Sequence, residues 1–333
     1  MRLIVTLAFG LLVCAPATPG QQQFPGTDRI RLAEAFKIGE SIGDQLWRHW
    51  DKAPFSVLLI TPDTEFLIRH PQPPDDFIKY GYDTVLNSQI YSRKRTQNLS
   101  LLATFPFAGV PTIVIGQAEN TAAKTSTRWV ITLLHEHFHQ LQYSQPDYYS
   151  SVSGLDLARG DETGMWMLTY PFPYGDAKVK EQFAAMSRML ARTLELDQSA
   201  DVAGRVAAYL EMRRRFETML KAEDYRYFSF QVWQEGISRY TEYRTAELAA
   251  AQHTPSKEFS GLSDFQPFGV VADGIFNNIV RQLSTLEFDK SKREAFYPFG
   301  AGEGLLLDRI APDWRKRYFA EPFFVDRYFH HSK

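Results

Sequence analysis

The chain has 333 residues, of which 44 % are hydrophobic, so it can bury a full-sized core and does not have the composition of a disordered protein. Its 37 Lys and Arg residues against 39 Asp and Glu residues leave a formal net charge of −2, which gives no general attraction to nucleic acid or anionic lipid. The one cysteine, Cys14, lies in a predicted leader, so the mature chain has no thiol for disulfides, nucleophilic catalysis or metal binding.

Residues 1–20 are typical of a signal peptide. Arg2 precedes an apolar stretch over 3–13, and small residues over 15–20 offer cleavage sites. The apolar stretch is short for a membrane span of about 20 residues, so no stable membrane anchor is expected. The sequence therefore predicts an exported protein, secreted or periplasmic.

The next segment, 21–126, is predicted to form an α/β lobe with a small sheet. Apolar residues over 30–50 recur at three- and four-residue steps, which predicts an amphipathic helix. Short β-branched and aromatic runs bounded by Pro, Gly and Asp predict four strands, at 55–60, 65–68, 101–107 and 112–115.

The segment 127–143 contains His135-Glu136-His137-Phe138-His139, an H-E-x-x-H pattern. Its apolar residues follow helical spacing, and a helix places His135 and His139 one turn apart on one face, where both imidazoles can bind one zinc ion beside Glu136. If the segment were instead a strand, three histidines could share one face. On a helix, His137 is rotated by about 200° from His135, so we interpret it as a surface or supporting histidine.

The remainder of the chain is predicted to be mainly helical. Turn formers and aromatics over 146–174 predict a long loop or short elements, and residues 297–304 predict a glycine-rich turn that opens a last helix. We expect the whole of 127–333 to form one catalytic unit with the histidine helix. Helical spacing predicts four further helices, at 179–196, 202–220, 227–251 and 268–286.

A third metal ligand is available in the predicted helix over 227–251. Glu235 and Glu242 lie two turns apart on one face of that helix, with Arg239 between them. Two histidines and one glutamate would leave a fourth coordination position for water, as catalytic zinc sites do. The alternative for Glu235 is an exposed carboxylate paired with Arg239.

The H-E-x-x-H segment, together with Trp233-Gln234-Glu235-Gly236, resembles the gluzincin metallopeptidases, the thermolysin and zinc-aminopeptidase superfamily. The resemblance implies an α+β, mainly α, thermolysin-like fold with a small N-terminal sheet lobe and a helical C-terminal lobe. It implies one zinc ion per chain held by His135, His139 and Glu235, with Glu136 as general base acting on the zinc-bound water. This chain departs from the family in two ways. The 96 positions between His139 and Glu235 are far more than in the aminopeptidases, and Arg239 stands where thermolysin-like enzymes have an Asp that orients a zinc-binding histidine.

The function implied by this resemblance is zinc-dependent hydrolysis of peptide bonds in a peptide or protein substrate. Stabilisation of the oxyanion is assigned to Tyr297, with Tyr240 as second choice. The strand over 112–116 is expected to be an edge that pairs with extended substrate. Two alternatives remain open: a zinc hydrolase acting on a non-peptide carbonyl, and a non-catalytic exported zinc-binding protein.

Overall fold

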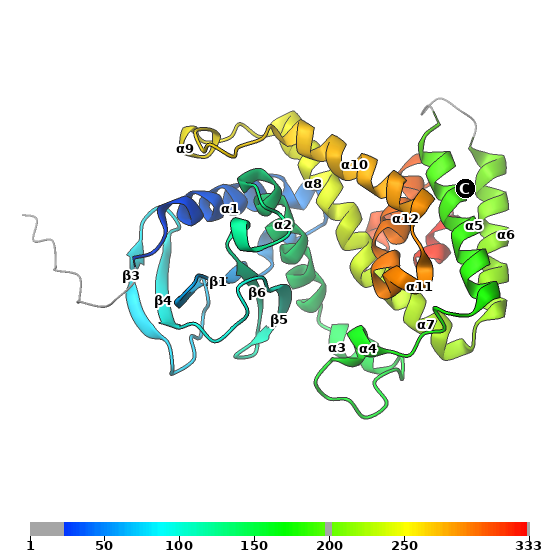
Figure 1. Cartoon of the computed structure of the whole chain (residues 1–333), viewed down its shortest axis with the longest axis horizontal. Coiled ribbons are helices and arrows are strands. Elements are labelled where there is room, and N and C mark those ends of the chain that lie inside the picture. Colours follow the sequence, from blue (N-terminus) through cyan, green and yellow to red (C-terminus); the bar gives the residue numbers. More distant parts are fainter. Residues whose placement is uncertain (1–22, 197–201, 332–333) are drawn as a thin grey trace, which may run out of the picture.

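The structure of the protein, a computed structural model, describes residues 23–196 and 202–331 (Figure 1). The predicted leader, 1–20, lies outside the described residues. The N-terminal part contains α1 (Gly26–Leu46), a short 3-10 turn at Trp50–Lys52, and all the strands of the described chain. These are β1 (Ser56–Ile60), β2 (Thr64–Ile68), β3 (Ile78–Asp83), β4 (Ser88–Lys94), β5 (Leu102–Phe107) and β6 (Val110–Gly116).

The six strands form one mixed sheet in the order β3-β4-β2-β1-β6-β5. β1 and β6 pair in parallel, with Val57 opposite Ile113, and the other neighbours are antiparallel. All five residues of β1 are buried, as expected for the continuous apolar run Ser-Val-Leu-Leu-Ile at the centre of a sheet covered on both faces. The four predicted strands are confirmed, and β3 and β4 are additional.

The predicted edge strand is wrong. β6 is hydrogen-bonded on both sides, to β1 and to β5, so its backbone has no free edge for a substrate. The outer position next to β6 is taken by β5, which continues from it through the tight turn at Ala108 and Gly109, both with positive φ. A two-residue connection of this kind favours an antiparallel hairpin, which covers the side of β6 that faces away from β1.

α2 (Ser126–Tyr143) connects the sheet to the helical part of the chain. Its Trp129 donates a hydrogen bond to the carbonyl of Gly116 at 2.8 Å, and its Gln140 donates to the carbonyls of Ser56 and Pro111. In Figure 1 the sheet lies on the left, α2 lies in the middle, and the other long helices except α1 lie from the middle to the right. One side of α2 therefore packs on the sheet at β1 and β6, and the other side faces the helical part of the chain.

Within the residues that the structure describes, every element after α2 is helical, so the protein is α+β and mainly α. The predicted helices are present, and the predicted loop over 146–174 contains two short helices. The helices are α3 (Tyr148–Ser153), α4 (Trp166–Thr169), α5 (Ala177–Leu194), α6 (Ala203–Met219), α7 (Ala222–Gln231), α8 (Ile237–Gln252), α9 (Lys257–Ser260), α10 (Phe268–Thr285), α11 (Phe288–Ser291) and α12 (Phe296–Ile310), with 3-10 turns at Ala118–Asn120, Lys292–Ala295, Trp314–Lys316 and Val325–His331.

α7 and α8 are joined without a break by a π-helical segment, η3 (Val232–Gly236). π segments inside helices are rare and are found frequently at functional sites. A Cβ atom on Gly236 would lie 2.5 Å from the Cα of Gly300 in α12, so glycine is needed at this crossing. The predicted glycine-rich turn over 297–304 is therefore wrong: these residues form the first part of α12, and glycine there permits close helix packing.

Within residues 23–196 and 202–331, no helix combines the length and the apolar character needed to cross a membrane.

Candidate metal centre

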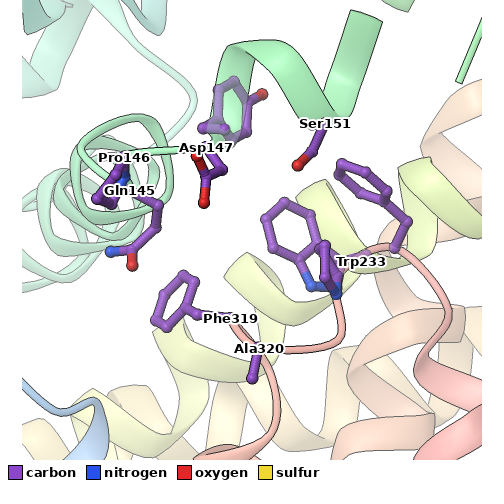
Figure 2. A pocket seen from close by; sticks show the side chains of 10 residues that line it. Gln145, Pro146, Asp147, Ser151, Trp233, Phe319 and Ala320 are labelled. Carbon is purple, nitrogen blue, oxygen red and sulfur yellow. The ribbon is translucent and has the colours of Figure 1, made fainter. Parts of the chain in front are cut away.

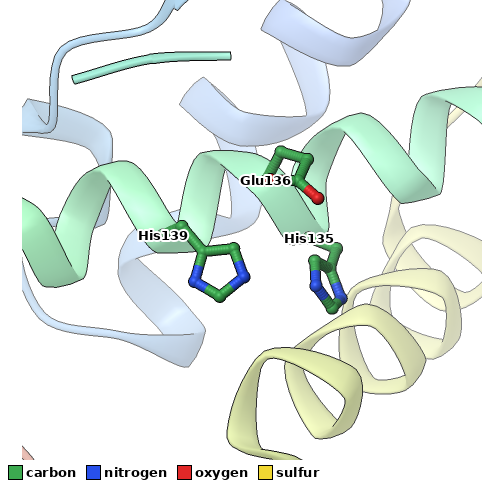
Figure 3. A group of neighbouring side chains, drawn as sticks. All are labelled: His135, Glu136 and His139. Atoms are coloured by element: carbon green, nitrogen blue, oxygen red, sulfur yellow. The ribbon is translucent and has the colours of Figure 1, made fainter. Parts of the chain in front are cut away.

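His135, Glu136 and His139 come together on α2 at the surface that faces α8. Potential ligand atoms of these three side chains all lie within 4.8 Å of one another. Figure 3 shows the two imidazole rings projecting from one side of α2 toward a yellow-green helix, with Glu136 beside them. The four-residue step between the histidines places both rings on one helical face, as the sequence predicts.

His137 has a different place from the one predicted. It is buried rather than at the surface, and its ring stacks on Phe55 at a centroid distance of 3.6 Å and on Trp50 at 5.4 Å. Burial lowers the pKa of His137 to about 3, so this imidazole is neutral. Its Nδ1 lies 2.8 Å from Oε1 of Gln140. His137 therefore belongs to the core between α1, α2 and the sheet.

Glu235 reaches the histidines from η3. Its Oε2 lies 3.4 Å from Nε2 of His139. Two ligands bound to one tetrahedral zinc at about 2.0–2.1 Å are about 3.3 Å apart, so this separation suits a shared metal ion. Glu235 lies outside the 4.8 Å group, but two imidazole nitrogens and one carboxylate form the donor set of an open, catalytic zinc site. The types of these residues and the separation between Glu235 and His139 therefore fit a zinc ion.

Gln142 orients His139. Oε1 of Gln142 lies 2.7 Å from Nδ1 of His139, while Nε2 of Gln142 donates to the hydroxyl of Tyr318 at 2.7 Å. The donation to Tyr318 fixes which end of the amide faces the imidazole. In the neutral ring Nδ1 then carries the hydrogen, and Nε2, the atom facing Glu235, is left as the metal-binding atom.

Glu242 supports His135. Its Oε2 lies 3.3 Å from Nδ1 of His135, which leaves Nε2 of that ring for a metal. The carboxylate is buried and pairs with Arg239, at 2.7 Å, and with Arg128 of α2, at 2.5 Å. Arg239 thus pairs with Glu242 and not with Glu235. No carboxylate lies four positions after Glu235 in the sequence, and Glu242, seven positions after it, is the one that lies next to His135.

Glu136 is held on the sheet side of the site. The hydroxyl of Thr104, in β5, lies 2.8 Å from Oε2 of Glu136 and 3.0 Å from its backbone oxygen. Glu136 is the carboxylate that lies within 4.8 Å of both histidines, where it can act as a base or as a ligand. The role of Thr104 has no signal in the sequence, because it depends on β5 lying over α2.

Tyr297 lies at the site and Tyr240 does not. The Tyr297 ring is parallel to that of His135 at a centroid distance of 6.4 Å, and its hydroxyl accepts a hydrogen bond from Nη1 of Arg293 at 2.9 Å. The same Nη1 lies 3.3 Å from Oε1 of Glu235. Tyr240 is buried, and its hydroxyl donates to Asp308, so the second choice for oxyanion stabilisation is wrong. Arg293 was not predicted.

The two glutamates beside the histidines are ionised. Burial alone would lower the pKa of His139 and raise that of Glu235, but their mutual contact outweighs it. The pKa of His139 rises to about 9, and that of Glu235 falls to about 2. Burial would likewise raise the pKa of Glu242, but Arg128 and Arg239 lower it well below its usual range. Glu235 and Glu242 are therefore both ionised around the imidazoles.

A pocket of about 330 Å³ lies between α3 and the segment 319–323 (Figure 2). Trp233 and Tyr148 line it, and none of the histidine-cluster residues or Glu235 does. The hydroxyl of Tyr148 donates to Gln234 at 3.1 Å, and the amide of Gln234 lies 3.2 Å from Nδ1 of His139. The pocket thus adjoins the support of the site and is not the place where the chemistry is expected.

The site thus brings together two histidines, the carboxylates of Glu136 and Glu235, and the hydroxyl of Tyr297 with the guanidinium of Arg293. Comparison of this chain with protein-family models, with curated proteins and with solved structures found no match.

Proposed function

We propose that the protein is a zinc metallopeptidase of the gluzincin kind, with a thermolysin-like arrangement of its site. His135, His139 and Glu235 hold one zinc ion, and Glu136 is the general base. The observation that carries this proposal is the approach of Glu235 to Nε2 of His139 at 3.4 Å, from a helix 96 positions away in the sequence. The predicted leader over 1–20 supports export of this enzyme to a periplasmic or extracellular location.

When bound, zinc would supply Lewis acidity that lowers the pKa of a water molecule and polarises the carbonyl of the substrate. Glu136 accepts a proton from this water as its oxygen bonds to the carbonyl carbon. The same carboxyl group then gives the proton to the leaving nitrogen as the C–N bond breaks. Thr104 keeps Glu136 in place through its 2.8 Å hydrogen bond.

Tyr297 is assigned to the developing negative charge on the carbonyl oxygen. Its hydroxyl accepts a hydrogen bond from Arg293 and is hydrogen-bonded to the Glu235 carboxylate, so its hydrogen turns from Glu235 to the substrate oxygen as the negative charge develops there. The adjacent guanidinium makes this hydroxyl a better donor. Burial and the Glu235 carboxylate raise the pKa of Tyr297 well above its usual range, so the hydroxyl keeps its proton at neutral pH.

The test uses the purified mature protein, a peptide library and the Glu136→Gln variant. We expect one zinc ion per chain and peptide cleavage by the wild type, and a loss of roughly 10²–10⁴-fold in kcat with zinc retained in the variant. Zinc binding without cleavage of any peptide would favour the non-peptide hydrolase or the binding protein. Failure to take up zinc would overturn the proposal.

A further inference from the structure

One face of α2 changes in character along its length. Arg128, His135, His139 and Tyr143 follow one another at steps of seven, four and four residues, so all four lie on the same face. At 1.5 Å per residue, Arg128 lies about 10 Å along the helix from His135, and Tyr143 lies about 6 Å beyond His139. The metal cluster is therefore flanked by a cation on one side and an aromatic ring on the other.

The cationic flank has more positive charge than its own carboxylate balances. Arg128 and Arg239 both pair with Glu242, whose side chain is 2 % exposed, whereas theirs are 27 % and 23 % exposed. Nε of Arg239 is buried and has no hydrogen-bond partner among the described residues. Two guanidinium groups on one buried carboxylate leave a net positive charge on this flank, and both arginine side chains are partly exposed to solvent.

The aromatic flank is a series of nearly parallel rings that begins at the metal cluster. Tyr143 stacks on His139 with a centroid distance of 6.3 Å, and Tyr149 of α3 stacks on Tyr143 at 6.4 Å. Tyr149 is 54 % exposed. Exposed aromatic rings that are fixed by stacking lose little entropy when a second apolar group packs on them.

We propose that the site selects peptides that carry a carboxylate on one side of the cleaved bond and a large apolar or aromatic side chain on the other. The carboxylate pairs with Arg128 and Arg239, and the apolar side chain packs on Tyr143 and Tyr149. This inference rests on the proposed peptidase function. An extended chain covers about 10 Å in three residues, so the carboxylate lies within about three residues of the cleaved bond.

The carboxylate can come from an acidic side chain or from the C-terminus of the peptide. Matched peptides separate the two: Glu against Gln at each position near the bond, and a free C-terminus against its amide. The expected result is a preference of roughly tenfold in kcat/KM for one carboxylate form, the size of one charge-assisted hydrogen bond. Fluorescently labelled versions of these matched peptides can also be titrated with the Glu136→Gln protein. Their binding affinities give a second readout that does not depend on turnover.

The cationic flank is tested with Arg128→Gln, because Arg239 still pairs with Glu242 in this variant. We expect the preference for the carboxylate peptide over its amide, a ratio of two kcat/KM values measured on the same variant, to fall toward one. Arg214→Gln, on the far side of the helical part in α6, removes an exposed arginine that pairs with Glu211 and should leave the preference unchanged.

The aromatic flank is tested with Tyr149→Ala, and the control is Tyr82→Ala, which removes a tyrosine of similar exposure on β3. Only Tyr149→Ala should reduce the preference for peptides with a large apolar side chain over peptides with alanine at the same position. Cleavage or binding that does not distinguish carboxylate from amide in the wild type would overturn the inference and leave the peptidase proposal standing. A protein that takes up no zinc and cleaves no peptide would instead contradict the peptidase proposal.

Discussion

Oε2 of Glu242 lies 3.3 Å from Nδ1 of His135, so the helix that supplies Glu235 also orients the first histidine of α2. Glu242→Gln keeps the shape of the side chain but removes the charge that Arg128 and Arg239 balance. We expect zinc affinity to fall about 10–100-fold, as loss of a carboxylate behind a zinc histidine does. Competition with a chromophoric chelator measures this affinity.

The matched control is Glu247→Gln, which removes a partly exposed carboxylate of α8 that pairs with Arg244. It should leave zinc affinity unchanged. If Glu242→Gln abolishes zinc binding while Glu235→Gln does not, Glu242 is the ligand and Glu235 the supporting residue.

Tyr297→Phe removes the hydroxyl that Arg293 contacts at 2.9 Å. If this hydroxyl meets the oxyanion, kcat should fall roughly 100-fold, the typical effect of losing one such donor, with zinc affinity unchanged. Tyr240→Phe is the control, because its hydroxyl bonds to Asp308 in the core. That variant should lose about 1 kcal/mol of stability and keep its kcat. Equal kcat in wild type and Tyr297→Phe would remove Tyr297 from the mechanism.

Gly236→Ala tests whether the close crossing of η3 and α12 positions Glu235. The new Cβ would meet the backbone of Gly300 and the carbonyl of Phe296, which lies at 2.9 Å, so the two helices must separate. We expect a loss of about 1–3 kcal/mol in the free energy of unfolding, together with weaker zinc binding.

The comparison for this variant is Gly274→Ala in α10, where a Cβ meets nothing within 4 Å. Alanine there should stabilise the helix by up to about 1 kcal/mol and leave zinc affinity alone. A stable Gly236→Ala protein with wild-type zinc affinity would show that the crossing is not needed to place Glu235.

The sequence predicted the part of the site that one helix carries. His135, Glu136 and His139 are neighbours in the chain, so helical spacing alone brings them to one region of α2. Glu235 was predicted from a short motif that follows the H-E-x-x-H segment in the chain. Nothing in the sequence shows that Glu235 lies in a π segment and faces His139. Thr104 lies on another element and had no signal.

The errors have physical causes as well. Residues 297–304 were assigned to a turn because glycine is a poor helix former, whereas close packing of α12 on η3 requires glycine. His137 was interpreted as a surface or supporting histidine because a helix rotates it by about 200° from His135, yet the face on which it lies is buried, and Phe55 and Trp50 accommodate its neutral form. β3 and β4 were missed because neither contains an apolar run: no residue of β3 is fully buried, and two of the three buried residues of β4 are serines.

The ionisation of Glu34, in α1, makes the free energy of unfolding depend on pH. It is buried and accepts hydrogen bonds from Nε2 of His253 and from Oγ of Ser256, both at 2.7 Å. Burial alone would raise the pKa of Glu34, but these hydrogen bonds outweigh it, and the pKa is lowered from 4.5. The unfolded chain therefore binds the proton more tightly than the folded one.

The stabilisation by ionised Glu34 is thus complete above the unfolded pKa near 4.5 and is lost as the pH falls through the lower folded value. Urea unfolding of wild type and Glu34→Gln between pH 3 and pH 7, a range of about four units around this pKa, measures it. The difference in stability between the two proteins should shrink with falling pH. A difference independent of pH would contradict the assignment.

The most direct test of the zinc site is a crystal structure of the mature protein grown with zinc, with anomalous data on both sides of the zinc absorption edge. We predict one anomalous peak on each chain, about 2.0–2.2 Å from Nε2 of His135, Nε2 of His139 and a carboxylate oxygen of Glu235. A peak that does not involve Glu235, or no peak between the two histidines, would contradict the account.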